Sequence, residues 1–211
     1  MNASHLIVAS VLLFLPFSVL AQDKYGTRDG VITFSSQTPL EEIIGVNRNV
    51  ASVLVLSTGE IQFSALVKAF EFEKALLEEH FNEDYMESSK FPKAIFKGHL
   101  VPKEGDDLSK VGIHEVGVVG ILTIHGIDKP LSTHATLETD KEGNISAKST
   151  FELHPEDFGM EIPGVVRDKI AKTINVKVAH SSSQLCYAPL NVQDHPIRCL
   201  ALHSCSIDRA G

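Results

Sequence analysis

Short segments in which apolar and polar residues alternate fill most of the chain after residue 29. A period of two places successive side chains on opposite faces of a strand, so each segment is typical of a β-strand with one buried face. Along Glu60–Phe70, for example, Ile61, Phe63 and Ala65 share one face and Gln62 lies on the other. Polar, glycine-containing turns separate the segments, as expected of antiparallel hairpins. We predict about eight strands, at Val31–Ser36, Asn49–Leu56, Glu60–Phe70, Pro92–Val101, His114–Ile124, Lys129–Asp140, Gly143–Leu153 and Ile174–Ala179.

Strands at this spacing predict a mainly β fold, either a sandwich or an antiparallel barrel. One segment interrupts the alternation. In Glu73–Met86 the side chains of Leu76, Leu77 and Phe81 recur at helical spacing, which predicts a surface helix inserted between the third and fourth strands. A second, shorter helix is predicted at Val165–Ala171, inside an irregular stretch before the last strand.

The N-terminal segment has a different pattern. Leu6–Leu20 is an almost unbroken apolar run that contains Pro16, and polar residues begin at Gln22. A run of about fifteen residues is typical of a cleaved signal peptide and short for a membrane span of roughly 20 residues, although a membrane anchor is the alternative. We therefore predict a signal peptide at residues 1–21, export to the periplasm or secretion, and no stable membrane insertion after cleavage.

The C-terminal tail also departs from the strand pattern. Ser181-Ser182-Ser183 predicts the end of the last strand, and apolar periodicity disappears beyond it. We predict residues 180–211 to be a poorly ordered appendage and residues 22–179 to be one folded domain. All the cysteines of the chain lie in this tail, where zinc binding and a single disulfide plus a free thiol both stay open: Cys186, Cys199 and Cys205.

Charge and motifs argue against several classes of protein. The chain has 19 Lys and Arg against 27 Asp and Glu, a net charge of −8, which disfavours nucleic acid as a partner. It contains no nucleophile elbow, phosphate-binding loop or dinucleotide fingerprint. The histidines outside the tail show no spacing typical of a metal site. The sequence therefore predicts a binding protein that is not an enzyme, with no catalytic residues, no metal and no catalytic cofactor.

Several separated stretches together resemble one known family. They are Phe70–Met86, Phe91–Gly98, Gly120–Gly126 and the pair Ile162-Pro163 with Val166–Ile170, in order along residues 30–179. The chain resembles the YceI-like family of exported polyisoprenoid-binding proteins. The resemblance implies an eight-stranded antiparallel barrel of lipocalin-like shape, capped by a helix. It also implies an elongated interior that holds an isoprenoid, an isoprenoid quinone or another long apolar chain. The extension beyond residue 179 departs from the family pattern at the strand that would close the barrel.

The inward positions of such a barrel decide whether it is open or packed, because eight strands leave room either for side chains or for one slim ligand. Small residues there, Gly98 and Gly120 among them, leave space, and aromatic rings line it. The leading hypothesis is a carrier or sequestering protein of the cell envelope. A ligand-free envelope stress or protein-interaction module with a packed core, an enzyme using a quinone, and a homodimer stay open. The predicted ligand-binding residues are Phe34, Phe63, Ala65, Phe70, Phe72, Leu76, Phe81, Ala94, Phe96, Gly120, Leu122, Ala135, Ala147 and Phe151.

Overall fold

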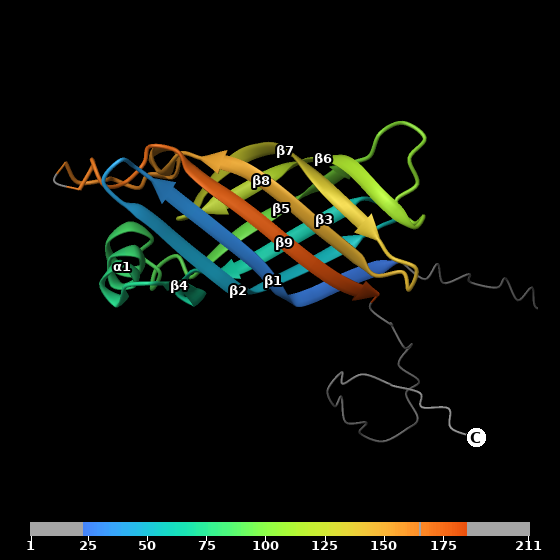
Figure 1. Ribbon diagram of the computed structural model, residues 1–211, viewed down its shortest axis with the longest axis horizontal. Helices are drawn as coiled ribbons and strands as arrows, with labels where there is room; N and C mark the ends of the chain where they lie inside the picture. The colour runs from blue at the N-terminus through green and yellow to red at the C-terminus, as the bar shows by residue number, and fades with distance from the viewer. Residues whose placement is uncertain (1–22, 165, 185–211) are drawn as a thin grey trace, which may run out of the picture.

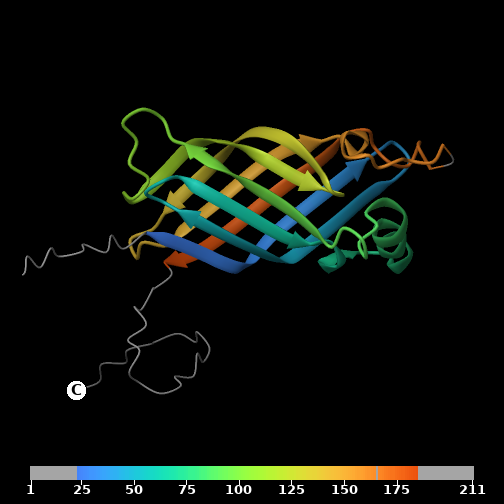
Figure 2. The same cartoon turned by 180° about the vertical axis from the view of Figure 1, so that it is seen from behind.

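The computed structural model describes residues 23–164 and 166–184. These residues form a closed barrel of antiparallel strands, seen from opposite sides in Figures 1 and 2. The strand order is β1-β9-β8-β7-β6-β5-β3-β2-β4, and the pairing of β1 with β2 closes the barrel. The predicted mainly β, eight-stranded barrel is thus confirmed, with β4 as a short addition. The strands are β1 (Lys24–Gln37), β2 (Glu42–Val55), β3 (Glu60–Leu66), β4 (Phe70–Phe72), β5 (Lys93–Val101), β6 (Gly112–Ile124), β7 (Ile127–Thr139), β8 (Ile145–Leu153) and β9 (Ile174–Gln184).

The predicted strand at Glu60–Phe70 is in fact two strands. β3 ends at Leu66, a single 3-10 turn (η1, Val67–Ala69) follows, and β4 then returns to pair with the first half of β2. Asn47 lies at the point along β2 where its pairing partner changes from β4 to β3. Its side chain is fully buried, its Nδ2 donates to the carbonyl oxygen of Leu66 at 2.8 Å, and its Oδ1 accepts from the backbone N–H of Asn49 at 2.9 Å. The amide therefore satisfies two backbone groups beside the break in the ladder.

The last strand is longer than its sequence predicts. β9 continues through the serine run, with Ser182 paired to Ile145 on β8 and Gln184 paired to Tyr25 on β1. The prediction that the serines end the strand is wrong, because ladder hydrogen bonds come from the backbone and do not depend on a β-favouring side chain. Ser182 is also buried and donates to the carbonyl oxygen of Ile145 at 3.2 Å. β9 therefore pairs with both of its neighbours, β8 and β1, and the barrel is closed on this side. The predicted cysteine tail beyond residue 184 and the predicted signal peptide lie outside the described residues.

The predicted surface helix is present in a shorter form. An α-helix (α1, Ala75–His80) runs directly into a π-helical turn (η2, Phe81–Tyr85). The second predicted helix is wrong: residues 166–171 form turns, such as the one closed by the Lys169 N–H on the Val166 carbonyl at 2.9 Å, and Val165 lies outside the described residues. A 3-10 turn (η3, Pro155–Phe158) begins this stretch. All these elements lie at one end of the barrel, which we call the open end (Figure 1).

The opposite end, here the closed end, is filled by apolar side chains. Residues 102–111 form a loop across it, and Leu108 of this loop is buried in the barrel core. Thr139 Oγ1 donates to the Leu108 carbonyl at 2.9 Å, and both ring nitrogens of His114 bond to the same loop. The core at this end packs the loop against the strands: its buried members include Tyr25, Leu54, Leu100, Leu108, Val116, Leu137 and Ile145.

Candidate functional site

The middle and open end of the barrel enclose a cavity of about 560 Å³. This volume lies within the roughly 300–1,000 Å³ typical of small-molecule sites. The cavity is lined almost entirely by apolar side chains from the strands, from η2 and from the stretch after β8. The barrel is therefore hollow, and the alternative of a packed interior does not describe it.

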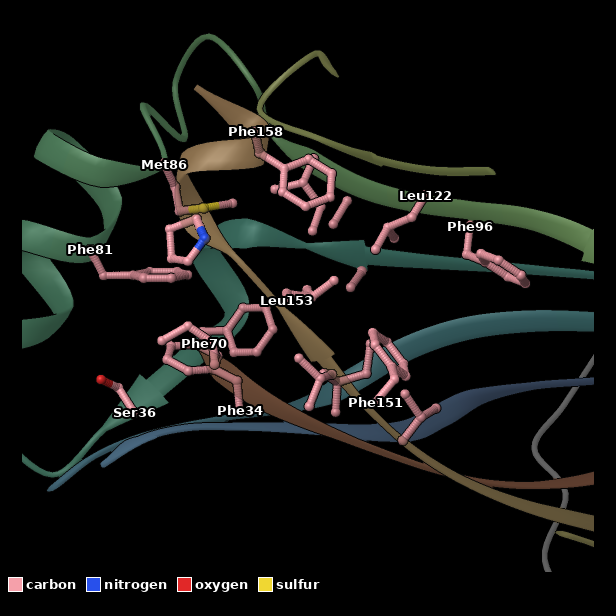
Figure 3. A pocket seen from close by; sticks show the side chains of 18 of the residues that line it. Phe34, Ser36, Phe70, Phe81, Met86, Phe96, Leu122, Phe151, Leu153 and Phe158 are labelled. Carbon is pink, nitrogen blue, oxygen red and sulfur yellow. The ribbon is translucent and has the colours of Figure 1, made fainter. Parts of the chain in front are cut away.

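Four phenylalanine rings form an aromatic group. Figure 3 shows three of them, Phe34, Phe70 and Phe81, on the helix side of the cavity. The Phe34 ring of β1 lies 5.4 Å from those of Phe70 and Phe81 and 5.7 Å from that of Phe72, measured between centroids. Phe81 also packs on Phe72 at 5.0 Å. These stacked, tilted and edge-on arrangements are favourable for aromatic pairs. The group joins β1, β4 and η2 into one apolar wall.

Most of the predicted ligand-binding residues border this cavity. Figure 3 shows the side chains of Phe34, Phe70, Phe81, Phe96, Leu122 and Phe151 around the same space. Their role in binding stays a prediction, but their placement together is a property of the fold. The predicted residues that border the cavity are Phe34, Phe63, Ala65, Phe70, Phe72, Leu76, Phe81, Ala94, Phe96, Leu122, Ala135, Ala147 and Phe151.

Gly120 is the exception among the predicted residues. It pairs with Gly98 across β5 and β6, and the ring of Phe96 covers both. A Cβ added at Gly120 would lie 2.3 Å from the Lys97 carbonyl oxygen and 2.8 Å from Phe96 Cζ. One added at Gly98 would lie 2.3 Å from the Val119 carbonyl oxygen and 2.7 Å from Phe96 Cζ. The prediction that these two glycines leave room for a ligand is wrong, because the backbone of the facing strand and the ring of Phe96 already occupy that room.

The stretch after β8 supplies cavity residues that were not predicted. Phe158 is 2% exposed and borders the cavity together with Met160, Ile162, Val166 and Ile170. Neither a period of two nor a period of 3.6 runs through this stretch, so periodicity does not identify them. The only signal in the sequence is the recurrence of apolar residues in a segment too irregular to be a helix or strand.

The mouth of the cavity lies beside α1. Leu76 of this helix borders the cavity although its side chain is 62% exposed, so the cavity reaches the surface there. Two polar pairs stand at this rim: Lys74 Nζ forms an ion pair with Glu41 Oε1 at 3.2 Å, and His80 Nδ1 is hydrogen-bonded to Asp84 Oδ2 at 2.6 Å. The site is thus polar at its rim and apolar inside.

The β6–β7 hairpin connects two other parts of the open end. His125 Nε2 lies 2.9 Å from Glu87 Oε2, and its Nδ1 lies 3.2 Å from the carbonyl oxygen of Phe158. Its ring also packs on Phe91 at 4.5 Å. Because a carboxylate and a carbonyl both accept, both bonds form together when the imidazole is protonated. The hairpin therefore holds η3 next to the loop that follows η2.

One side of the barrel is joined less completely near the mouth. β7 and β8 pair only from Ala135 with Ser149 to Thr139 with Ile145. Toward the open end, side chains bridge the two strands instead: Ser149 Oγ donates to the His134 carbonyl at 2.7 Å, and Thr133 Oγ1 donates to that of Thr150 at 3.3 Å. Both Thr133 and Ser149 border the cavity, which therefore extends to this seam.

Two further properties concern the described part of the chain. Within residues 23–164 and 166–184, no three His, Cys, Asp or Glu side chains are grouped so that they could hold a metal ion. No helix in those ranges is long and apolar enough to cross a bilayer.

A closed antiparallel barrel with an apolar cavity that opens beside a helix defines a class, the hollow β-barrels of lipocalin-like shape. Within this class, the chain belongs to the YceI-like domain family, whose model matches residues 27–181. The resemblance noted in the sequence is thereby confirmed.

Relatives and solved structures agree with this assignment. Protein YceI of Escherichia coli is 28% identical over 117 residues, which cover 54% of this chain and 48% of that protein. The chain thus spans about half the length of the curated relatives it matches. A polyisoprenoid binding domain from Saccharophagus degradans matches with a TM-score of 0.66 and 13% identity over 78% of this chain and 99% of that one. Burkholderia cenocepacia BcnA matches with a TM-score of 0.62 and 13% identity over 74% and 96% of the respective chains. At this identity the likeness concerns the fold.

Proposed function

We propose that the protein binds one long apolar ligand, a polyisoprenoid or a related lipid, inside the barrel. The observation that carries this proposal is the apolar cavity of about 560 Å³ with its mouth beside α1. Each methylene group moved from water into such a cavity contributes about 0.8 kcal/mol, so burial of ten of them contributes about 8 kcal/mol before the cost of immobilisation. The binding energy would come from the length of the chain.

Two other facts support this class of ligand. The family of the chain is YceI-like, and a solved structure with the same fold is described as a polyisoprenoid binding domain. The apolar run at residues 6–20 is typical of a signal peptide, which supports export. We therefore infer a carrier or sequestering protein of the cell envelope, acting in the periplasm or after secretion, with the lipid as its partner rather than as a catalytic cofactor.

The experiment is native mass spectrometry of freshly purified protein, followed by removal of lipid and titration with geranylgeraniol. We expect a co-purifying apolar mass and saturable uptake of one geranylgeraniol per chain. Ala135→Phe, which places a ring in the cavity, should abolish uptake, whereas Ala51→Phe on the exposed face of β2 should not. Circular dichroism checks that both variants keep the barrel. Repeated recovery of lipid-free wild-type protein that takes up no geranylgeraniol would refute the proposal.

A further inference from the structure

A buried hydroxyl interrupts the apolar lining of the cavity near the open end. Ser36 of β1 is 2% exposed and borders the cavity. Figure 3 shows its side chain beside Phe34, on the side of the open end. Its Oγ accepts from the backbone N–H of Ala171 at 2.8 Å, and its own proton has no acceptor among the described residues. The hydroxyl is therefore free to donate to an oxygen of a group in the cavity.

The segment that bonds to this hydroxyl also carries a lysine. Lys169 lies two residues before Ala171, so the two Cα atoms are within about 7 Å of each other. Its side chain is exposed, borders the cavity and forms no ion pair among the described residues. Because the ammonium stands on a flexible four-carbon stem, it can reach a group that is hydrogen-bonded to Ser36.

A second lysine stands on the other side of the hydroxyl. Ser36 is paired with Ile43 on β2, and Glu41 precedes Ile43 by two residues, so it is a diagonal neighbour of Ser36 at about 7–8 Å. Glu41 borders the cavity and accepts from Lys74 Nζ at 3.2 Å, and Lys74 borders the cavity as well. The Lys74 side chain is 62% exposed, so this ion pair is weak and leaves ammonium protons for a ligand. We call Ser36, Glu41, Lys74 and Lys169 the mouth cluster.

The charges around the cavity are mostly positive, although the chain as a whole is acidic. Among the described residues that border the cavity, three are lysines, Lys74, Lys148 and Lys169, and Glu41 is the one acid. The whole chain has 19 basic against 27 acidic residues. Asp168, the acidic neighbour of Lys169, does not border the cavity. The mouth cluster thus offers hydrogen-bond donors and positive charge, which suit a group with anionic oxygens.

We propose that the mouth cluster binds an anionic head group of the apolar ligand, a phosphate or a carboxylate. This inference rests on the proposed function and adds the class of head group and the orientation: the head lies at the mouth and the chain extends inward. Ser36 Oγ and Lys169 Nζ donate to the head-group oxygens, and Lys74 shares its ammonium between Glu41 and the ligand. Hydrogen bonds to a charged group are about twice as strong as neutral ones, so the head group adds affinity to that of the buried chain.

The test measures the affinity of the full-length, lipid-free protein for four probes: geranylgeranyl phosphate, geranylgeranoic acid, geranylgeraniol and the hydrocarbon phytane. We expect at least one anionic probe to bind about tenfold more tightly than the alcohol, with an advantage that shrinks as salt is added. Tighter binding of the phosphate alone identifies a phosphate lipid, and tighter binding of the acid alone identifies a fatty acid; either result supports the site.

Two charge-matched variants locate the head group. Lys169→Gln should weaken binding of the preferred anion about tenfold, equivalent to about 1.4 kcal/mol, and leave the affinity for geranylgeraniol unchanged. Lys177→Gln, on the exposed outer face of β9 and away from the cavity, removes the same charge and should change neither affinity. Circular dichroism checks that both variants keep the barrel.

Several outcomes would overturn the site. Anions that bind no more tightly than the alcohol would exclude an anionic head group, and this readout needs no variant. Equal losses in Lys169→Gln and Lys177→Gln would reduce the effect to the net charge of the protein. If no probe binds, phytane included, the proposed function itself fails; if phytane and the alcohol bind and the anions gain nothing, only the inference about the mouth cluster fails.

Discussion

Acidification should destabilise the barrel through His180. Burial lowers the pKa of this imidazole from 6.5 to about 4 in the folded protein. In the unfolded chain the pKa of His180 returns to its ordinary value. Below pH 6.5 the imidazole is therefore protonated in the unfolded state but stays neutral in the folded state until the pH approaches 4. The stabilising contribution is therefore complete above pH 6.5 and is lost as the pH falls through about 4.

The size of the effect follows from the difference between the two pKa values. A difference from 6.5 to about 4, at about 1.4 kcal/mol per pKa unit, corresponds to a loss of about 3 kcal/mol between pH 7 and pH 4. Urea unfolding at pH 7, 5.5 and 4, monitored by circular dichroism, measures the free energy of unfolding at each pH. Because a domain of this size is stable by about 5–15 kcal/mol, the loss is large enough to measure.

Other groups also titrate in this range, so the informative quantity is the difference between wild type and His180→Phe. His114, for example, acts in the opposite direction: its bond to the Lys110 carbonyl and then its contact with Asp106 raise its pKa, so it stabilises the fold at low pH. This background is common to both proteins and cancels. Wild type should lose about 3 kcal/mol more than the variant between pH 7 and 4. Parallel pH curves for the two proteins would refute the argument that His180 is buried and neutral.

Three further predictions concern packing, the ladder and the mouth. Gly120→Ala should cost about 1–3 kcal/mol of unfolding free energy, since the new methyl would meet the Lys97 carbonyl oxygen at 2.3 Å and a Phe96 ring carbon at 2.8 Å. Gly117→Ala on the same strand, with its nearest atom at 3.4 Å, should be almost neutral, and equal costs in urea unfolding would contradict this. Asn47→Ala should cost about 1–2 kcal/mol in the same assay, because it removes a fully buried amide together with its hydrogen bonds to two part-buried backbone groups, and the exposed Asn49→Ala should cost much less. Leu76→Ser should weaken geranylgeraniol binding several-fold without lowering the melting temperature, because this side chain is 62% exposed; an unchanged affinity would remove Leu76 from the site.

The alternation of apolar and polar residues predicts the barrel strands well, because successive side chains of such a strand point alternately into the barrel and away from it. Along β3, Ile61, Phe63 and Ala65 point inward as the alternation requires, and they border the cavity. Where an inward side chain is polar, as Ser182 is, the signal fails. The serines of β9 belong to the strand because both of its neighbours pair with their backbone, and that information lies far away in the sequence.

The cavity is harder to predict than the barrel, because it depends on which side chain fills which space. In the sequence Gly98 and Gly120 suggest open space inside the barrel. In the structure the ring of Phe96 lies against both glycines and fills part of that space. His180 lies beyond the predicted end of its strand, so its inward position and its bond to Ser52 follow only from the closed barrel. Volume and polarity inside a core are three-dimensional properties, whereas periodicity is local.

A closed barrel can remain hollow because its backbone does not depend on its contents. Each of the eight long strands pairs with a neighbour on both sides, so the ladder closes into a ring, although β7 and β8 pair only in the part away from the mouth. The packed core at the closed end and the aromatic group at the mouth supply apolar burial at the two ends. Between them, alanines such as Ala65, Ala94 and Ala147 leave the middle of the barrel open. The barrel is therefore packed at its two ends and hollow between them, where a ligand could supply the missing contacts.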